Sequence, residues 1–234
     1  MPQDILITGG AGFIGGHLAE ALLKHGDRVT AVDSLNGYYD IGLKEETLQI
    51  LQSYNEEADT TGKPPIFTFH KCLIENETDL RGVFQKAYEK KQGKPAFDCV
   101  VHLAAQAGVR YSVEHPAEVM ILNVIGTQRV LDMAKEFKVP YVVASSSSSV
   151  YGMSSVTPFS EDQPCNKPVS PYAASKRANE MQAHAWHHLT NIPVTMLRFF
   201  TVYGPRGRGL RVHAGPLGRL RATRAASALR HDGL

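Results

Sequence analysis

Residues 8–16 read TGGAGFIGG, and this stretch decides how the chain folds. It follows an apolar run, DILIT (4–8), and opens a helical pattern that ends at Gly26. Glycines at this spacing permit a tight turn, let the backbone approach a pyrophosphate, and let the helix pack close to the strand. The free N–H groups of the helix N-terminus attract phosphates. We therefore predict a dinucleotide site rather than a plain turn, with cofactor contacts from Gly9, Gly12, Phe13, Ile14 and Gly15.

Beyond this motif, short β-branched runs alternate with longer helical patterns. Such alternation is typical of βαβ units with parallel strands and right-handed crossovers. Six strands fit the doubly wound α/β sheet of a Rossmann fold, in the order 3-2-1-4-5-6. The pattern predicts strands at 4–8, 28–33, 66–70, 97–105, 140–146 and 193–200, a polar loop at 56–65, and helices at 13–26, 43–54, 77–91, 115–137 and 172–189.

Composition narrows the class of protein. The net charge of +2 is misleading, because residues 1–205 carry 18 basic and 22 acidic side chains, whereas residues 206–234 carry seven arginines and one acid. The body of the chain therefore gives no reason to expect nucleic-acid binding. Three widely spaced cysteines suit reduced thiols in a cytoplasmic protein. The N-terminus does not resemble a signal peptide, and no apolar run reaches the roughly 18 residues of a membrane span.

The end of the second strand bears on the choice of cofactor. Asp33 stands there, 18 residues after Gly15. A carboxylate at this place accepts hydrogen bonds from the adenosine ribose and repels a 2′-phosphate, which favours NAD over NADP. Ser34 and Asn36 follow, with no arginine nearby, and we include Asn36 among the cofactor contacts. An ordinary loop acid is the alternative interpretation of Asp33.

A second group of residues points to catalysis. Tyr172 and Lys176 lie one helical turn apart in SPYAASK (170–176). A lysine cation there is expected to lower the pKa of the phenol, which could then take a proton from a carbinol while a nicotinamide takes the hydride. The run ASSSSSVYG (144–152) follows the fifth strand, at the sheet edge where such folds bind ligands. A surface Tyr–Lys pair and a serine-rich turn are the alternatives.

Taken together, these motifs resemble the extended short-chain dehydrogenase/reductases. The resemblance spans roughly residues 3–208, and its nearest branch is the nucleotide-sugar epimerases that act on UDP-glucuronate at C4. It rests on TGGAGFIG, HLAAQAGVR (102–110), ASSSSSVYG, PYAASK and RFFTVYGP (198–205), with NGYYD (36–40) and AAQAGVRYS (104–112) specific to that branch.

The resemblance implies roles for particular residues. Tyr172 would be the base, Lys176 its partner and a ribose ligand, and Ser147 the catalytic hydroxyl. The reaction would oxidise C4 of a UDP-sugar with bound NAD, turn the 4-keto ring over and return the hydride, with no metal. Leu103, Ala104 and Ala105 would line the cofactor, and Ser148, Thr201 and Arg208 would bind the substrate.

The resemblance also implies a homodimer through helices 115–137 and 172–189. A nucleotide-sugar dehydratase or decarboxylase is a related alternative, although Ser147-Ser148-Ser149 offer hydroxyls rather than the carboxylate that those reactions need. A non-catalytic NAD-binding or dimerising fragment is the rival from another class. His184 and His188 have a zinc-like spacing, but without a third ligand they are interpreted as surface residues.

Two departures from the family pattern stand out. Cys72-Leu73 occupy the place of the expected Gly-Asp after the third strand, where Glu75 or Asn76 could substitute. After residue 208 the pattern is lost, so we expect an NAD-binding domain over 1–208, a largely missing C-terminal substrate lobe, and a disordered basic tail over 209–234. Either a frameshifted or truncated gene model or a genuine basic tail would account for this ending.

Overall fold

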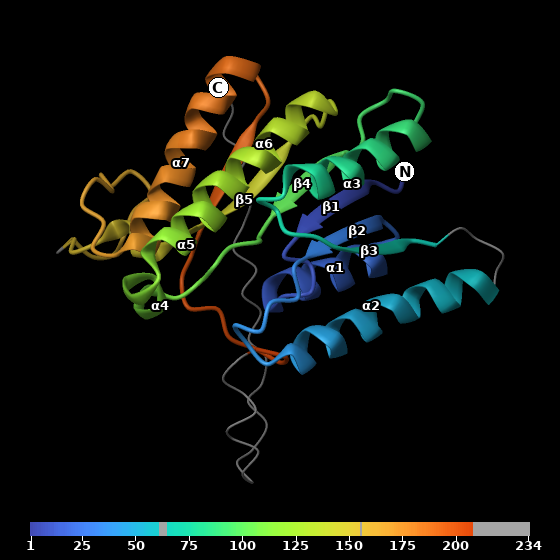
Figure 1. The fold of residues 1–234 in the computed structure, drawn as a ribbon, viewed down its shortest axis with the longest axis horizontal. Coiled ribbons are helices and arrows are strands. Elements are labelled where there is room, and N and C mark those ends of the chain that lie inside the picture. The colour runs from blue at the N-terminus through green and yellow to red at the C-terminus, as the bar shows by residue number, and fades with distance from the viewer. Residues whose placement is uncertain (61–64, 155, 208–234) are drawn as a thin grey trace, which may run out of the picture. The chain divides into compact units, whose positions relative to one another are not determined.

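A six-stranded parallel sheet forms the centre of the fold (Figure 1). The structure is a computed structural model that describes residues 1–60, 65–154 and 156–207. The strand order β3-β2-β1-β4-β5-β6 confirms the predicted doubly wound topology. The strands are β1 (Asp4–Thr8), β2 (Arg28–Asp33), β3 (Phe67–Lys71), β4 (Cys99–His102), β5 (Val142–Ser147) and β6 (Val194–Phe199).

Helices cover both faces of this sheet, and each face has its own core (Figure 1). On one face, α1 (Phe13–His25) and α2 (Ile41–Thr60) bury Leu23 and Leu51. On the other, α3 (Glu77–Lys90), α6 (Gly126–Glu136) and α7 (Pro171–Thr190) pack against the strands, with Phe84 fully buried. Burial from both sides explains why the inner strands are almost wholly apolar.

Three elements differ from the sequence prediction. Helix α2 continues to Thr60, so the loop predicted over 56–65 is wrong for residues 56–60, while 61–64 lie outside the described residues. Polar residues there do not break a helix, because neither Gly nor Pro occurs before Gly62. The strand predicted over 97–105 is limited to Cys99–His102. The loop that follows begins at Leu103, where the backbone lies against Gly9.

The long helix predicted over 115–137 is interrupted. It comprises α5 (Pro116–Met120), a π-helical segment η1 (Ile121–Ile125) and α6, and it is preceded by an unpredicted short helix, α4 (Val109–Glu114). A π-helical turn changes which side chains face the core, and such turns are frequent at functional sites. Here the turn holds the buried Asn123.

The chain divides into two units, Met1–Val202 and Tyr203–Leu234. Only residues 203–207 of the second unit are described, so the predicted boundary at 208/209 and the predicted disordered tail lie outside the described residues. Among the described residues, no helix is long and apolar enough to cross a membrane. No three His, Cys, Asp or Glu side chains in that part of the chain are grouped to hold a metal ion.

Candidate active site

The glycine turn after β1 forms a cradle that side chains would fill. Gly9 has φ +73°, and a Cβ on it would lie 2.8 Å from the backbone nitrogen of Ala104. A Cβ on Gly15 would collide with the carbonyl oxygen of Gly9. Helix α1 begins at Phe13 with no side-chain cap on Gly12, so its first N–H groups remain free for an anion. This backbone arrangement fits the pyrophosphate of a dinucleotide.

A buried histidine fixes the loop that faces this cradle. His102 Nδ1 lies 2.7 Å from Thr8 Oγ1, and its Nε2 lies 3.0 Å from Thr127 Oγ1. Thr8 Oγ1 also accepts the N–H of Ala104 at 3.2 Å. Burial lowers the pKa of His102 to about 3, so the ring is neutral and donates from one nitrogen while accepting at the other. This chain of hydrogen bonds places Leu103 and Ala104 beside Gly9, and Ala105 is the next residue of the same loop.

The predicted ribose ligand Asp33 lies at the end of β2 and is only 6% exposed. Its Oδ1 accepts the backbone N–H of Leu35 at 2.9 Å and Lys44 Nζ at 2.9 Å. Lys44 also donates to Oδ1 of Asn36 at 3.2 Å. The structure thus brings Asp33 and Asn36 together through a cation that the sequence analysis missed. The only signal for it was a lysine in the first turns of the helix that follows NGYYD.

Cys72 and Leu73, which depart from the family pattern, follow β3 at the same sheet edge. Cys72 is buried, and this burial raises the pKa of its thiol to about 11. Of the two possible substitutes for the missing acid, Asn76 is occupied, because its side chain caps α3 by accepting the N–H of Asp79 at 3.2 Å. Within the described part of the chain, Glu75 has a buried Oε2 without a hydrogen-bond partner, so it is the better placed of the two.

The predicted catalytic hydroxyls meet at the carboxyl end of β5. Ser147 ends this strand, Tyr172 lies in the first turn of α7, and the Ser147 hydroxyl is close enough to lower the pKa of the Tyr172 phenol. Ser170 caps α7 by accepting the N–H of Ala173 at 3.0 Å, which fixes the start of the helix. Lys176, 2% exposed, lies one turn further along α7.

The pKa of Tyr172 differs from the sequence expectation. Burial raises this pKa, and the Ser147 hydroxyl only partly opposes the effect. Lys176 Nζ donates to the carbonyl oxygen and the hydroxyl of Ser145 at 2.9 and 3.0 Å. Its own pKa is lowered to about 8 by burial. Desolvation therefore dominates both groups, a cause that helical spacing alone does not reveal.

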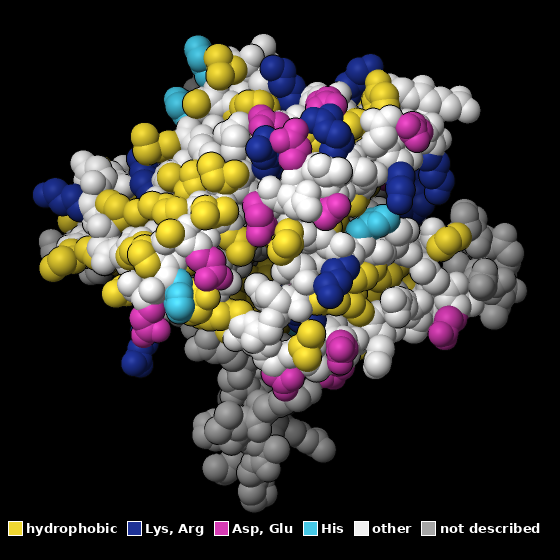
Figure 2. Space-filling view, in the orientation of Figure 1, with side chains coloured by type: hydrophobic (Ala, Val, Ile, Leu, Met, Phe, Trp, Pro, Cys, Tyr) yellow, Lys and Arg dark blue, Asp and Glu magenta, His cyan; other side chains and the backbone are white. Residues whose placement is uncertain are grey.

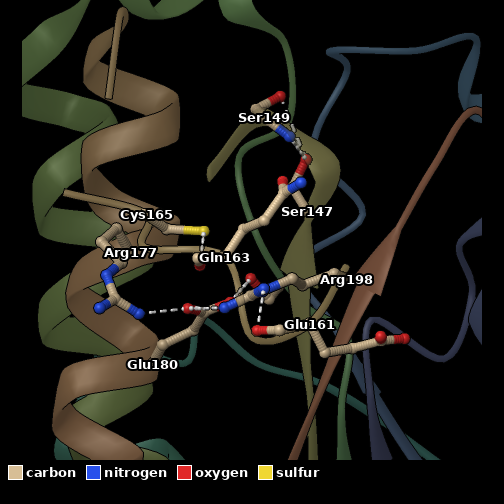
Figure 3. Close-up of polar contacts among 9 residues, drawn as sticks. Ser147, Ser149, Glu161, Gln163, Cys165, Arg177, Glu180 and Arg198 are labelled. Atoms are coloured by element: carbon tan, nitrogen blue, oxygen red, sulfur yellow. Dashed lines mark hydrogen bonds and ion pairs between the residues drawn. The ribbon is translucent and has the colours of Figure 1, made fainter. Parts of the chain in front are cut away.

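A charged network fixes β5 and β6 behind these hydroxyls (Figure 3). Glu180 of α7 accepts hydrogen bonds from Ser146, Arg177 and Arg198 at 2.6, 2.7 and 2.8 Å. Burial alone would raise the pKa of Glu180, but these hydrogen bonds hold it below its usual value. Arg198 also donates to the carbonyl oxygen of Glu161 at 3.0 Å. The network, which the sequence analysis missed, holds Ser146 in place next to Ser147.

Asn123 is a second buried polar residue that the sequence analysis missed. Its Oδ1 accepts the N–H of Gln106 at 2.7 Å, and its Nδ2 donates to Ser175 Oγ at 3.0 Å. Its carbonyl oxygen accepts Nδ2 of Asn179 at 3.0 Å. These bonds join the loop after β4 to α7. A lone amide in the apolar run MILNVIG (120–126) was the available signal.

The predicted substrate ligands are less closely grouped. Ser148 begins the short helix η2 (Ser148–Tyr151), directly after Ser147. Thr201 follows β6 and is exposed. Arg208 lies outside the described residues. Of the two described residues, Ser148 adjoins Ser147 in the chain and Thr201 lies two residues beyond the end of β6.

Comparisons with known proteins agree with this geometry. The model of the NAD dependent epimerase/dehydratase family matches residues 5–228. Protein CapI of Staphylococcus aureus is 45% identical over 206 residues, which cover 88% of this chain and 56% of that relative.

Two solved structures extend the comparison. A UDP-glucuronic acid 4-epimerase from Bacillus cereus, in complex with UDP-glucuronic acid and NAD, matches with a TM-score of 0.71 and 36% identity, over 88% of this chain and 59% of that one. TunA, an NAD-dependent NDP-hexosamine 5,6-dehydratase, matches with a TM-score of 0.66 and 35% identity, over 87% and 56%. The chain spans little more than half the length of these relatives.

Substitution of Gly9 by alanine tests the cradle. We expect Gly9→Ala to weaken NADH binding by about tenfold or more, because a Cβ at φ +73° both strains the turn and displaces Ala104. Fluorescence titration with NADH measures the effect. Gly82→Ala in α3 is the matched control, since a Cβ there meets nothing within 4 Å and should leave binding unchanged. Equal affinity of the two variants would contradict the assignment.

The buried histidine makes stability depend on pH. The pKa of His102 is about 3 in the folded chain, below its usual 6.5. The contribution of the neutral ring to the free energy of unfolding is therefore full above pH 6.5 and is lost as the pH falls toward 3. The difference in unfolding free energy between wild type and His102→Gln should shrink by about 1 kcal/mol between pH 6.5 and 5.5, because the histidine of the unfolded chain is already half protonated at pH 6.5. Urea titrations at both values measure it, with the exposed His184→Gln as a control. A difference independent of pH would contradict the neutral, buried ring.

Proposed function

This chain belongs to the NAD-dependent epimerase/dehydratase family, and we propose that it carries the catalytic half of a nucleotide-sugar 4-epimerase. The substrate we propose is UDP-glucuronate, converted to UDP-galacturonate through a 4-keto intermediate. The observation that carries the proposal is the meeting of Ser147, Tyr172 and Lys176 at the carboxyl end of β5, where Lys176 is bonded to Ser145 and the Ser147 hydroxyl acts on the Tyr172 phenol. The similarity to the Bacillus cereus enzyme, whose structure holds UDP-glucuronic acid and NAD, supports the choice of sugar.

The residues of the chain divide the chemistry between them. Tyr172 takes the proton from the sugar 4-hydroxyl and returns it, while Ser147 holds that oxygen in line with the phenol. Lys176 keeps a positive charge near the phenol and offers its remaining N–H to a ribose hydroxyl. Bound NAD would accept the hydride from C4 of the sugar. The positive charge of its nicotinamide ring would favour the phenolate form of Tyr172, which burial alone disfavours. The turn at Gly9 and the side chain of Asp33 orient the cofactor.

Sugar recognition is proposed for Ser148, Thr201 and Arg208. A guanidinium suits a sugar carboxylate because it can form two parallel hydrogen bonds with it. Thr201 is exposed directly after β6, which keeps its hydroxyl available.

A dehydratase is the second candidate activity, because TunA is about as similar as the epimerase structure. Sugar dehydration needs an acid or base that eliminates water, in addition to the tyrosine. The residues after Ser147 are Ser148 and Ser149, and Ser147 Oγ donates to Ser149 Oγ at 3.2 Å. A run of hydroxyls at this point favours the epimerase.

A homodimer is also part of the proposal. Hydrophobic side chains gather over α5 and α7 in Figure 2, on the face turned away from the sheet. Exposed members of this group are Met120, Ile121, Ile125, Met181 and Leu189, at 38–74% exposure. Two copies packed face to face would bury this helical surface in an isologous interface.

Removal of the Tyr172 hydroxyl tests the chemistry. We expect the chain to interconvert UDP-glucuronate and UDP-galacturonate, and Tyr172→Phe to lower the rate by about a hundredfold or more, because the proton acceptor is lost. Chromatography of the two UDP-sugars and the absorbance of bound NAD are the measurements. Tyr88→Phe on α3 removes a phenol away from the site and should be silent. Bound NAD without interconversion would contradict epimerase activity for this chain and favour a non-catalytic NAD-binding fragment.

Charge on the apolar helical face tests the dimer. Met181→Glu should convert a dimer to a monomer in sedimentation velocity, because a carboxylate would be buried without a partner. Met153→Glu is the matched control, since Met153 is 86% exposed outside the group and its replacement should not affect assembly. A wild-type chain that sediments as a monomer at micromolar concentration would refute the interface.

A further inference from the structure

Lys44 joins the cofactor edge from a helix that the sequence motif does not include. Its side chain, 12% exposed, reaches from α2 to the end of β2. The Nζ atom lies 2.9 Å from Asp33 Oδ1 and 3.2 Å from Asn36 Oδ1. An ammonium group has three N–H donors, so one remains for a further acceptor at the same place.

The two oxygens of Asp33 are used differently. Oδ1 accepts both the N–H of Leu35 and Lys44 Nζ. No hydrogen bond within the described part of the chain uses Oδ2, and this atom is not sealed from solvent. The turn is also held in an unusual form, because Leu35 has φ +53°. The carboxylate is therefore fixed by Oδ1 and presents Oδ2 to a ribose hydroxyl.

The cation changes how this carboxylate discriminates between cofactors. A lone carboxylate disfavours a 2′-phosphate by repulsion, and it favours a ribose by accepting hydroxyl protons. Lys44 bonds directly to Asp33, so its positive charge offsets much of the repulsion. Hydrogen bonding from the 2′-hydroxyl to Oδ2 then remains as the main basis of preference. The spare donor of Lys44 would meanwhile attract a phosphate.

We propose that Lys44 is a cofactor-specificity residue, and that the Asp33–Lys44 pair, rather than Asp33 alone, sets the preference for NAD over NADP. The proposal rests on the NAD site described above. In the wild type, Asp33 holds Lys44 and limits its access to a 2′-phosphate. Without the Asp33 charge, Lys44 becomes a phosphate ligand.

Four proteins test the proposal by fluorescence titration with NADH and NADPH: wild type, Asp33→Asn, Lys44→Gln and the double variant. Asp33→Asn should gain NADPH affinity relative to NADH by about tenfold or more, the factor for one charge-assisted hydrogen bond. Lys44→Gln should lose NADPH affinity more than NADH affinity. The double variant should lack the gain, because the phosphate ligand is missing. Thermal unfolding checks that each variant is folded.

Lys71→Gln is the matched control for loss of a nearby cation. Lys71 is paired with Asp33 in the β2–β3 ladder but makes no hydrogen bond to it. Its replacement should leave the ratio of NADH to NADPH affinity unchanged. If Lys44→Gln weakens both cofactors by the same factor, alone and with Asp33→Asn, Lys44 only supports the fold and the proposal is overturned. A folded wild type that binds neither cofactor overturns the NAD site itself, and the proposal with it.

Discussion

The close approach of two backbone segments, the turn at Gly9 and the loop after β4, is the constraint on which the site depends. There is no room for a Cβ between Gly9 and Ala104, so the two segments touch through main-chain atoms. Thr8 maintains this contact, because its hydroxyl bonds both His102 and the N–H of Ala104. The ring of His102 stays neutral because burial disfavours its charged form. A neutral histidine thereby links the strand ladder to the cofactor cradle.

The catalytic end depends on a different set of buried polar groups. Ser145, Ser146 and Ser147 are consecutive in β5, yet each has its own partner: Lys176 bonds Ser145, Glu180 bonds Ser146, and the Ser147 hydroxyl acts on the Tyr172 phenol. All three partners come from α7, so this helix positions the whole run. The alternation of a strand would send neighbouring side chains to opposite faces. Three partners from one helix are possible because the strand ends here and α7 crosses its edge.

Local sequence patterns predicted the sheet order, the glycine cradle and the meeting of the serine run with Tyr172 at one edge, whereas the choice of Ser147 within that run came from the family resemblance. These features follow from periodicity and from the rule that parallel strands end together. The contacts of Lys44, Asn123 and the Glu180–Arg198 pair were not predictable in this way, because each joins elements far apart in sequence. The raised pKa of Tyr172 was missed because spacing indicates a neighbouring charge but not the degree of burial. The helix predicted over 43–54 was too short, because the polar residues 56–60 were interpreted as a loop although they continue α2.

The proposed function assigns cofactor chemistry and sugar recognition to different parts of the chain. Asp33, Ser147, Tyr172 and Lys176 all lie within the unit Met1–Val202, and so do Lys44 and Ser145, to which Asp33 and Lys176 are bonded. Of the proposed carboxylate ligands, Thr201 lies at the end of that unit and Arg208 beyond it. The contacts that position the proposed NAD site and the proposed proton acceptor are therefore made within the first unit. The proposal assigns the choice among UDP-sugars to Ser148 and to the chain after β6, so substitutions of Thr201 or Arg208 are expected to change sugar preference without changing NAD binding.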